Sequence, residues 1–218
     1  MDVLLNNSEL FLSNFGNTIK LFLIAAVLCL VFGTVLAMMR VSPVPVFRGF
    51  GTVYVNVVRN TPLTLVFFFF AFAFPLLDFV DRESFSPFIA AVIALTLYTS
   101  AFVCEVVRSG INTIAVGQLE ASRALGLTFG QTLSNVVLPQ ASRSVVPPMV
   151  STMIALLKNT TIAAGFSVAE AGAIRDTLSE RSYSVTIGLL WVALFFIILV
   201  IPLTLVQRSL EKRWSVAR

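Results

Sequence analysis

Five long hydrophobic runs alternate with polar stretches along the chain. They cover residues 19–39, 53–77, 88–107, 145–166 and 185–206. A helix needs about 20 predominantly apolar residues to cross a ~30 Å hydrocarbon core, and each run meets that length. The pattern therefore predicts an all-α membrane protein with five transmembrane helices, and residues 1–218 form a single transmembrane domain.

Prolines and polar residues predict irregular helix geometry in two of these runs. The second run is the longest and contains Pro62, which predicts a kink or a tilt. The fourth run begins at Pro147 and Pro148, residues that are tolerated in the first turn of a helix. Lys158 and Gly165 lie further along it, so we expect its outer half to be broken.

The composition agrees with a membrane protein. Hydrophobic residues make up 57% of the chain, charged residues only 12%, and mean hydropathy is +0.93. A soluble domain carries about twice that charge. Histidine is absent, and Cys29 and Cys104 lie inside apolar runs, so neither a metal site nor a disulfide is predicted. The N-terminus has no basic region or cleavage pattern, which predicts a retained first helix.

Lysine and arginine are distributed unevenly between the two sides of the predicted helices. If the N-terminus lies outside, five spans place the C-terminus inside, and ten of the fifteen basic residues fall inside. These ten are Arg40, Arg48, Arg59, Arg108, Arg123, Arg143, Arg208, Lys212, Arg213 and Arg218. Of the acidic residues, only Glu105, Glu120 and Glu211 fall there. Because cytoplasmic loops are enriched in Lys and Arg, this orientation is predicted, and the net charge of +4 requires no nucleic acid.

The polar segment between the third and fourth runs carries helix start and stop signals. Glu120–Leu125 reads as a short helix, and Gly126 can adopt the left-handed conformation that ends it. Thr128 and Gln131 have the spacing of a capping box, which opens a second helix. Pro139 is expected to stop that helix. The segment is thus predicted to be a compact helix–turn–helix on the cytoplasmic face.

This segment resembles the EAA loop of permease subunits in bacterial ATP-binding-cassette (ABC) importers. That motif reads Glu-Ala-Ala, three residues, Gly, nine residues, Ile-x-Leu-Pro. The residues that match it in register are Glu120, Ala121, Gly126, Leu138 and Pro139. Ser122 replaces the second Ala and Val136 replaces Ile. The resemblance implies that residues 108–145 form a coupling loop that binds a cytoplasmic ABC ATPase.

Three further segments look like the polar amino acid branch of these importers, which takes up His, Glu, Gln or Arg. They are Arg59–Leu63, Glu105–Ile111 and Lys158–Thr161. The resemblance implies the MetI-like importer permease fold in a bacterial cell membrane. It also implies transport of a polar amino acid, such as glutamate or another acidic or amide amino acid. An external solute-binding protein delivers it, and a second permease subunit completes a homo- or heterodimer.

The chain lacks the phosphate-binding motif of an ATPase. Its lysines are Lys20, Lys158 and Lys212, and none follows a glycine. We therefore expect no catalytic residue, metal or cofactor here, with ATP and Mg²⁺ bound by the partner ATPase dimer. Five helices are also too few to enclose a solute path, which predicts a dimeric membrane core.

Each residue of the coupling motif has an expected role. Glu120 is expected to cap or hold the loop, with Ala121 and Ser122 allowing close approach. Gly126 makes the turn, and Leu138 with Pro139 fixes the exit into the fourth span. Alternatively, the segment is an interfacial helix whose Arg123 and Arg143 meet lipid headgroups. The turn, cap and stop at the motif's spacing favour ATPase binding.

Polar residues within the apolar runs are candidates for the solute pathway, because charge inside a membrane is costly and often functional. These candidates are Arg59, Asn60, Thr61, Tyr98, Lys158, Asn159, Thr160 and Thr161. Arg59 lies about two turns into the second span and could instead snorkel to the inner interface. Glu105 and Arg108 are expected to pair locally. The phenylalanines at 67–70, 72 and 74 are expected to contact lipid or the second subunit.

Two other function classes remain as alternatives. A secondary transporter driven by an ion gradient would need an intramembrane carboxylate, and only Glu105 is available. A membrane enzyme lacks support because no histidine, metal cluster or nucleophile–base pair is visible. Within the importer class, Arg59 and Lys158 would create a positive field that favours acidic amino acids.

Overall fold

The computed structural model describes residues 2–78, 80–81 and 85–214, and these ranges contain helices but no strand. Four helical runs are long and apolar enough to cross a membrane, and a fifth crossing is possible if one bent pair counts as a span. The four are α2 (Ser8–Val41), α5 (Pro87–Ile111), residues 129–166 and α10 (Val185–Trp214). The predicted all-α fold is confirmed.

The second hydrophobic run is broken more sharply than the predicted kink. Helix α3 (Pro45–Arg59) ends before Pro62, and α4 (Leu63–Phe68) leaves it at a bend of 104°. A π turn (Phe69–Ala73) and a 3-10 turn (Phe74–Leu76) continue α4. Proline has no N–H to donate to the preceding turn and disfavours the helical conformation of the residue before it, so the helix ends here.

The fourth span differs from its prediction at three prolines. A helix of four residues, α7 (Phe129–Thr132), passes through a π turn (Leu133–Val137) directly into α8 (Leu138–Asn159). Pro139 therefore does not stop the helix, and Pro147 and Pro148 lie inside α8 rather than in its first turn. The wider π turn, closed by the Leu138 N–H on the Leu133 carbonyl, precedes Pro139 and relieves crowding against the preceding turn.

The outer half of the fourth span is not broken, contrary to the prediction, because the helix continues to Phe166 and only changes its type. Helix α8 changes at its end into a 3-10 helix (Thr160–Phe166), and Ser167 then adopts a left-handed conformation with φ 62°. A short 3-10 turn (Ala171–Ala173) and α9 (Ile174–Glu180) lead from there to α10. At the same end of the molecule, α1 (Asp2–Leu5) precedes α2.

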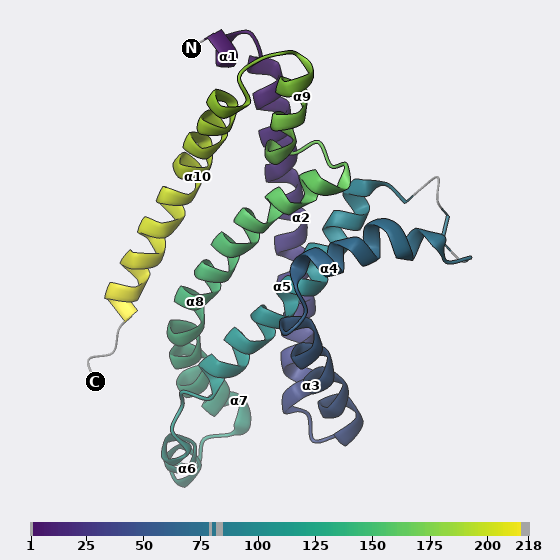
Figure 1. Ribbon diagram of the computed structural model, residues 1–218. Helices are drawn as coiled ribbons and strands as arrows, with labels where there is room; N and C mark the ends of the chain where they lie inside the picture. The colour runs from purple at the N-terminus through teal and green to yellow at the C-terminus, as the bar shows by residue number, and fades with distance from the viewer. Residues whose placement is uncertain (1, 79, 82–84, 215–218) are drawn as a thin grey trace.

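Helix α2 packs along α5 in the centre of the fold, with α8 on the other side of α5 (Figure 1). Gly33 permits this contact, because a Cβ there would lie 2.6 Å from the Val103 Cβ. The core includes Phe67, which is buried and stacks on Phe166 with ring centroids 5.1 Å apart. The prediction of lipid or subunit contact was therefore wrong for Phe67, whereas Phe68, Phe69 and Phe72 are exposed.

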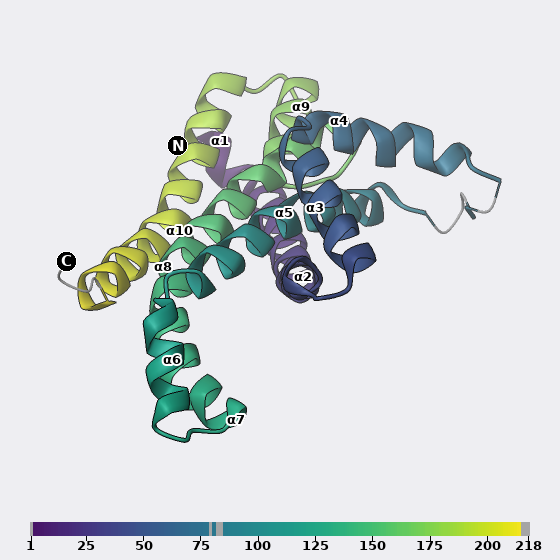
Figure 2. The same ribbon diagram turned by 90° about the horizontal axis from the view of Figure 1, so that it is seen from below.

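Helix α10 runs beside α8, but only 6% of its most apolar stretch is buried (Figure 2). Helix α6 (Val116–Ala124) and α7 form a knob at the end of the molecule opposite the N-terminus (Figure 2).

Candidate functional site

The knob of α6 and α7 contains the EAA-like residues, and its first turn has the predicted geometry. Gly126 has φ 74°, in the left-handed region. Its N–H donates to the Arg123 carbonyl at 2.9 Å, and the Leu127 N–H donates to the Ser122 carbonyl at 3.1 Å. These two bonds form a Schellman motif, which satisfies the last carbonyls of α6.

The second helix of the knob opens with the predicted capping box. The Gln131 N–H donates to the Thr128 hydroxyl at 3.3 Å, and the Thr128 N–H donates to the Gln131 side-chain oxygen at 2.9 Å. Two backbone donors are therefore satisfied reciprocally. Together, the Schellman motif and the capping box define the turn between α6 and α7, and α6 also contacts the π turn of Leu133–Val137.

The surface of the knob is open for a partner. Leu125 and Phe129 are 81% and 82% exposed on either side of the turn. Glu120 is also exposed and makes no hydrogen bond or ion pair with a described residue, so it does not hold the loop as expected. Ala121 is exposed, whereas Ser122 is buried and donates to the Gln118 carbonyl at 2.7 Å. Leu125 and Phe129 were not predicted as surface residues of this site, although apolar residues in a polar loop were the available signal.

The base of the knob is fixed to two membrane helices. Gly110 of α5 packs so closely on α8 that a Cβ there would lie 2.2 Å from the Val145 Cγ2. The Thr113 hydroxyl donates to the Ser144 hydroxyl at 3.1 Å. A movement of the knob would therefore be passed to α5 and α8 together.

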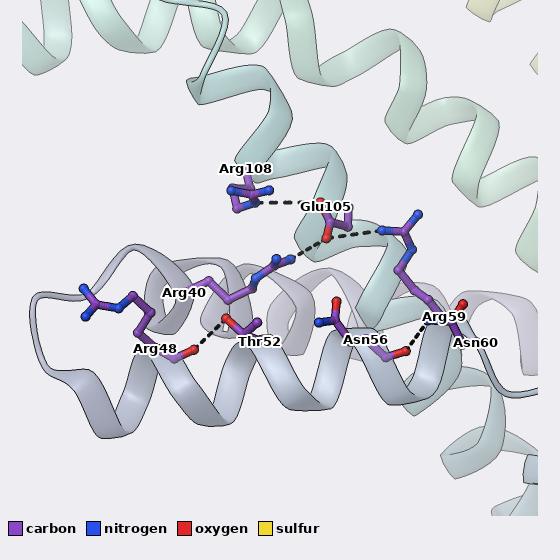
Figure 3. A network of polar contacts seen from close by, with 8 residues as sticks. All are labelled: Arg40, Arg48, Thr52, Asn56, Arg59, Asn60, Glu105 and Arg108. Carbon is purple, nitrogen blue, oxygen red and sulfur yellow. Dashed lines mark hydrogen bonds and ion pairs between the residues drawn. The ribbon is translucent and has the colours of Figure 1, made fainter.

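A cluster of charged side chains lies near the C-terminal end of α5, centred on Glu105 (Figure 3). The Glu105 carboxylate pairs with Arg40 of α2, with Arg59 of α3 at 3.2 Å, and with Arg108 of its own helix at 3.7 Å. The predicted Glu105–Arg108 pair is confirmed, while the pairs to Arg40 and Arg59 were not foreseen. Glu105 is thus engaged by three guanidinium groups rather than available as a free carboxylate for ion coupling.

Arg59 lies at the exposed edge of this cluster. It occupies the last turn of α3, not the second turn of a longer span, and its side chain is 44% exposed. The guanidinium carbon lies 5.7 Å from the centre of the Phe102 ring. Asn60 and Thr61 bond back to carbonyls of α3, at 2.7 and 2.8 Å. These two side chains therefore satisfy carbonyls in the last turns of α3.

A groove of about 340 Å³ runs between α5 and α8. Most of its surface is apolar, but several hydroxyl side chains and one amide line it, so it is called the polar groove below. Its lining residues are Tyr98, Thr99, Phe102, Ser151, Thr152, Ala155, Leu156 and Asn159. The Thr99 hydroxyl is buried and has no hydrogen-bond partner among the described residues. Because this oxygen is itself shielded, the groups that suit the groove to a hydrogen-bonding ligand are those of the other polar lining residues, Tyr98, Ser151, Thr152 and Asn159. Phe102 lines this groove and also lies under the Arg59 guanidinium, so Arg59 is near one edge of the groove.

The Lys158–Thr161 segment does not converge on one site. Of its four residues, Asn159 lines the polar groove with Tyr98. Lys158 and Thr161 instead line a mainly apolar groove of about 350 Å³ beside α10. Thr160 is fully buried and donates to the Leu157 carbonyl at 2.7 Å. The assignment of these residues to the solute pathway remains a prediction.

Comparisons with known proteins agree with this architecture. Residues 29–216 match the family described as the inner membrane component of binding-protein-dependent transport systems. The glutamate transport system permease protein GluC of Corynebacterium glutamicum is 42% identical, covering 94% of this chain and 93% of that protein. The probable glutamine ABC transporter permease protein GlnM of Bacillus subtilis is 34% identical, covering 98% and 97%.

Solved structures share the same fold. An amino acid ABC transporter with histidines superposes with a TM-score of 0.88 at 25% identity, covering 96% of each chain. The MetNI methionine ABC transporter superposes with a TM-score of 0.76 at 20% identity, covering 96% of this chain and 98% of that chain, and this second likeness concerns the fold alone.

The chain is therefore a multi-pass permease subunit of a cell-membrane importer. It belongs to the family of inner membrane components of binding-protein-dependent transport systems. The predicted resemblance to the polar amino acid branch of ABC permeases is confirmed by these relatives. Membership implies that an ATPase and a substrate-binding protein act with it.

Proposed function

We propose that this permease subunit imports glutamate or a closely related acidic amino acid. The observation that carries the proposal is the polar groove of Tyr98, Thr99 and Asn159 beside the arginine-rich cluster. Hydroxyl and amide side chains can bind the ammonium and carboxylate groups common to amino acids. Three arginines face one glutamate in the cluster, and this excess of positive charge favours a solute with an additional carboxylate.

The chain works as one half of a membrane core. Its groove is open on one side and α10 is largely unpacked, so a second permease subunit, identical or related, completes the solute path. The knob binds a cytoplasmic ATPase dimer, which holds ATP and Mg²⁺. The chain itself binds no cofactor and catalyses no reaction.

Transport measurements test the substrate assignment. The complete complex, with its ATPase and binding protein, is reconstituted in liposomes and supplied with radiolabelled glutamate. We expect ATP-dependent uptake that unlabelled glutamate or aspartate suppresses more strongly than glutamine or arginine does. Preference for a neutral or cationic amino acid would overturn the acidic assignment while leaving the permease class intact.

The groove itself is tested by the Asn159→Ala substitution. Loss of a hydrogen bond to a charged solute group costs about 1.5–3 kcal/mol, so we expect uptake at low substrate concentration to fall about 10-fold or more. The comparison variant is Lys158→Met, because Lys158 is the pathway candidate on the neighbouring groove beside α10. Normal uptake with Asn159→Ala and loss with Lys158→Met would move the pathway to the α8–α10 side.

The proposed orientation has the N-terminus outside and the C-terminus in the cytoplasm. It is supported by the excess of basic residues on the side of the knob. A cysteine replacing Asp81 should react with an impermeant thiol reagent added outside intact cells, whereas one replacing Lys212 should react only after permeabilisation. Cys29 and Cys104 are buried and are replaced by alanine in both variants. The reverse labelling pattern would put the knob on the face that lacks ATP.

A further inference from the structure

Glu170 is a buried carboxylic acid that the transport site does not use. It lies between the 3-10 helix of residues 160–166 and α9, at the end of the molecule that carries the N-terminus, and its side chain is fully buried. One carboxyl oxygen, Oε1, accepts the Gly172 N–H at 2.7 Å. The other, Oε2, lies 3.3 Å from the Thr18 hydroxyl of α2.

Further hydrogen bonds fasten the same segment to α2. The Ala171 N–H donates to the Thr18 hydroxyl oxygen at 3.0 Å. The side-chain amides of Asn14 and Asn17 donate to the carbonyls of Glu170 and Ala169, at 3.2 and 2.8 Å. Segment 167–173 is therefore held on α2 by a compact set of polar contacts.

The hydrogen-bonding pattern is complete when Glu170 carries a proton. The Thr18 hydroxyl lies 3.1 Å from the Asn14 carbonyl as well as 3.3 Å from Glu170 Oε2, and it has one hydrogen to give. A protonated Glu170 donates to the Thr18 oxygen, which leaves the Thr18 hydrogen for Asn14. An ionised Glu170 competes with Asn14 for that hydrogen, so the Thr18 hydroxyl can serve only one of the two acceptors.

No cation compensates a negative charge at this position. The charged residues on the surrounding elements are Glu9, Lys20 and Arg40 on α2, Lys158 before the 3-10 helix, and Arg175, Asp176 and Glu180 on α9. None of these described side chains pairs with Glu170, and Arg175 pairs with Asp176 instead. Burial raises the pKa of Glu170 to about 7, against the opposing effect of its hydrogen bonds.

The segment held by Glu170 continues from the solute groove. Asn159 of the groove is followed directly by the 3-10 helix, and Gly172 packs on that helix. A Cβ at Gly172 would lie 3.1 Å from the Thr161 carbonyl oxygen and 3.0 Å from the Ala164 Cβ. Release of Glu170 would therefore loosen the helix end that borders the groove.

We propose that segment 167–173 is a proton-controlled latch, which is closed on α2 while Glu170 is protonated and released when Glu170 ionises. Glu170 binds its proton more tightly in the closed state than in the released state, where its pKa has the usual glutamate value of 4.5. Glu170 therefore stabilises the closed state fully below about pH 4.5. That contribution is lost as the pH rises through about 7. Alkaline medium on this side opens the latch, and acidic medium closes it.

Hydrogen–deuterium exchange of the assembled complex in lipid nanodiscs tests the latch. After correction for the intrinsic pH dependence of exchange, the opening equilibrium of residues 167–173 should increase about tenfold between pH 6 and pH 8. Glu170→Gln retains the acceptor for Gly172 and can donate to Thr18, so it imitates the protonated form. Its opening should change less than twofold over this range. The matched control, Glu180→Gln, alters an exposed carboxyl on α9 and should keep the tenfold change.

Two results would overturn the latch. Equal pH dependence in the wild type and Glu170→Gln would show that another group controls the segment. Strong protection at pH 8 in the wild type would show that ionised Glu170 holds the segment as firmly as the acid. Because neither measurement involves uptake or substrate, failure of the latch is distinguishable from failure of the glutamate assignment.

Discussion

Replacing Gly126 with valine should abolish solute uptake while leaving membrane insertion intact. Gly126 has φ 74°, and a β-branched residue strongly resists this conformation. Strain of this kind costs about 1–3 kcal/mol, which lowers the population of the correct turn about 5-fold to more than 100-fold. A Cβ at this position meets no atom within 4 Å, so the effect arises from the backbone rather than from a steric clash. ATP-dependent uptake by the reconstituted complex is the measurement, with expression in the membrane as the check on insertion.

Two variants isolate the conformational cause. Gly126→Asn should retain most of the uptake, because asparagine adopts the left-handed conformation more readily than other residues with a side chain. Gly130→Ala places a methyl group in open space on α7 and should also transport normally. If Gly126→Val transported as well as these two controls, the turn would not be needed for coupling to the ATPase.

The local parts of the knob could be predicted from the sequence because their signals lie within a few residues. The Schellman turn at Gly126 and the capping box of Thr128 and Gln131 depend on backbone geometry and neighbouring side chains alone. The path from α7 into α8 could not be predicted in the same way. It depends on a π turn before Pro139, and the stop signal of the proline was therefore misleading.

The five hydrophobic runs identified the membrane helices, but hydropathy does not show where a helix changes direction. Apolar residues continue on both sides of Pro62, so the 104° turn between α3 and α4 was concealed within one run. The packing of α3 on α2 and α5 brings Arg59 to Glu105, and this ion pair joins helices that are far apart in the sequence. Glu170 was missed for a related reason. Only packing shows that this carboxyl lies buried against α2 without a cation.

Replacing Glu105 with glutamine should destabilise the packing of α2 and α3 against α5 and reduce uptake severely. The substitution removes the one carboxylate that joins Arg40, Arg59 and Arg108, and leaves three cations close together. The Arg40 side chain is only 9% exposed, so most of the loss comes from leaving this cation without its partner, which typically costs about 3–5 kcal/mol in a buried site. The more exposed pairs to Arg59 and Arg108 contribute little, because solvent screens them.

The measurements for Glu105→Gln are thermal unfolding of the purified complex and ATP-dependent uptake, and both should fall. Adding Arg40→Gln to this variant removes the stranded cation and should recover part of the thermal stability, since the two residues act as a pair. The matched control is Asp176→Asn, which breaks the exposed Arg175–Asp176 pair and should leave stability and uptake unchanged. Equal stability of Glu105→Gln and the wild type would show that Glu105 does not hold α2 and α3 against α5. Failure of Arg40→Gln to recover any stability would mean that the loss arises outside the charged cluster.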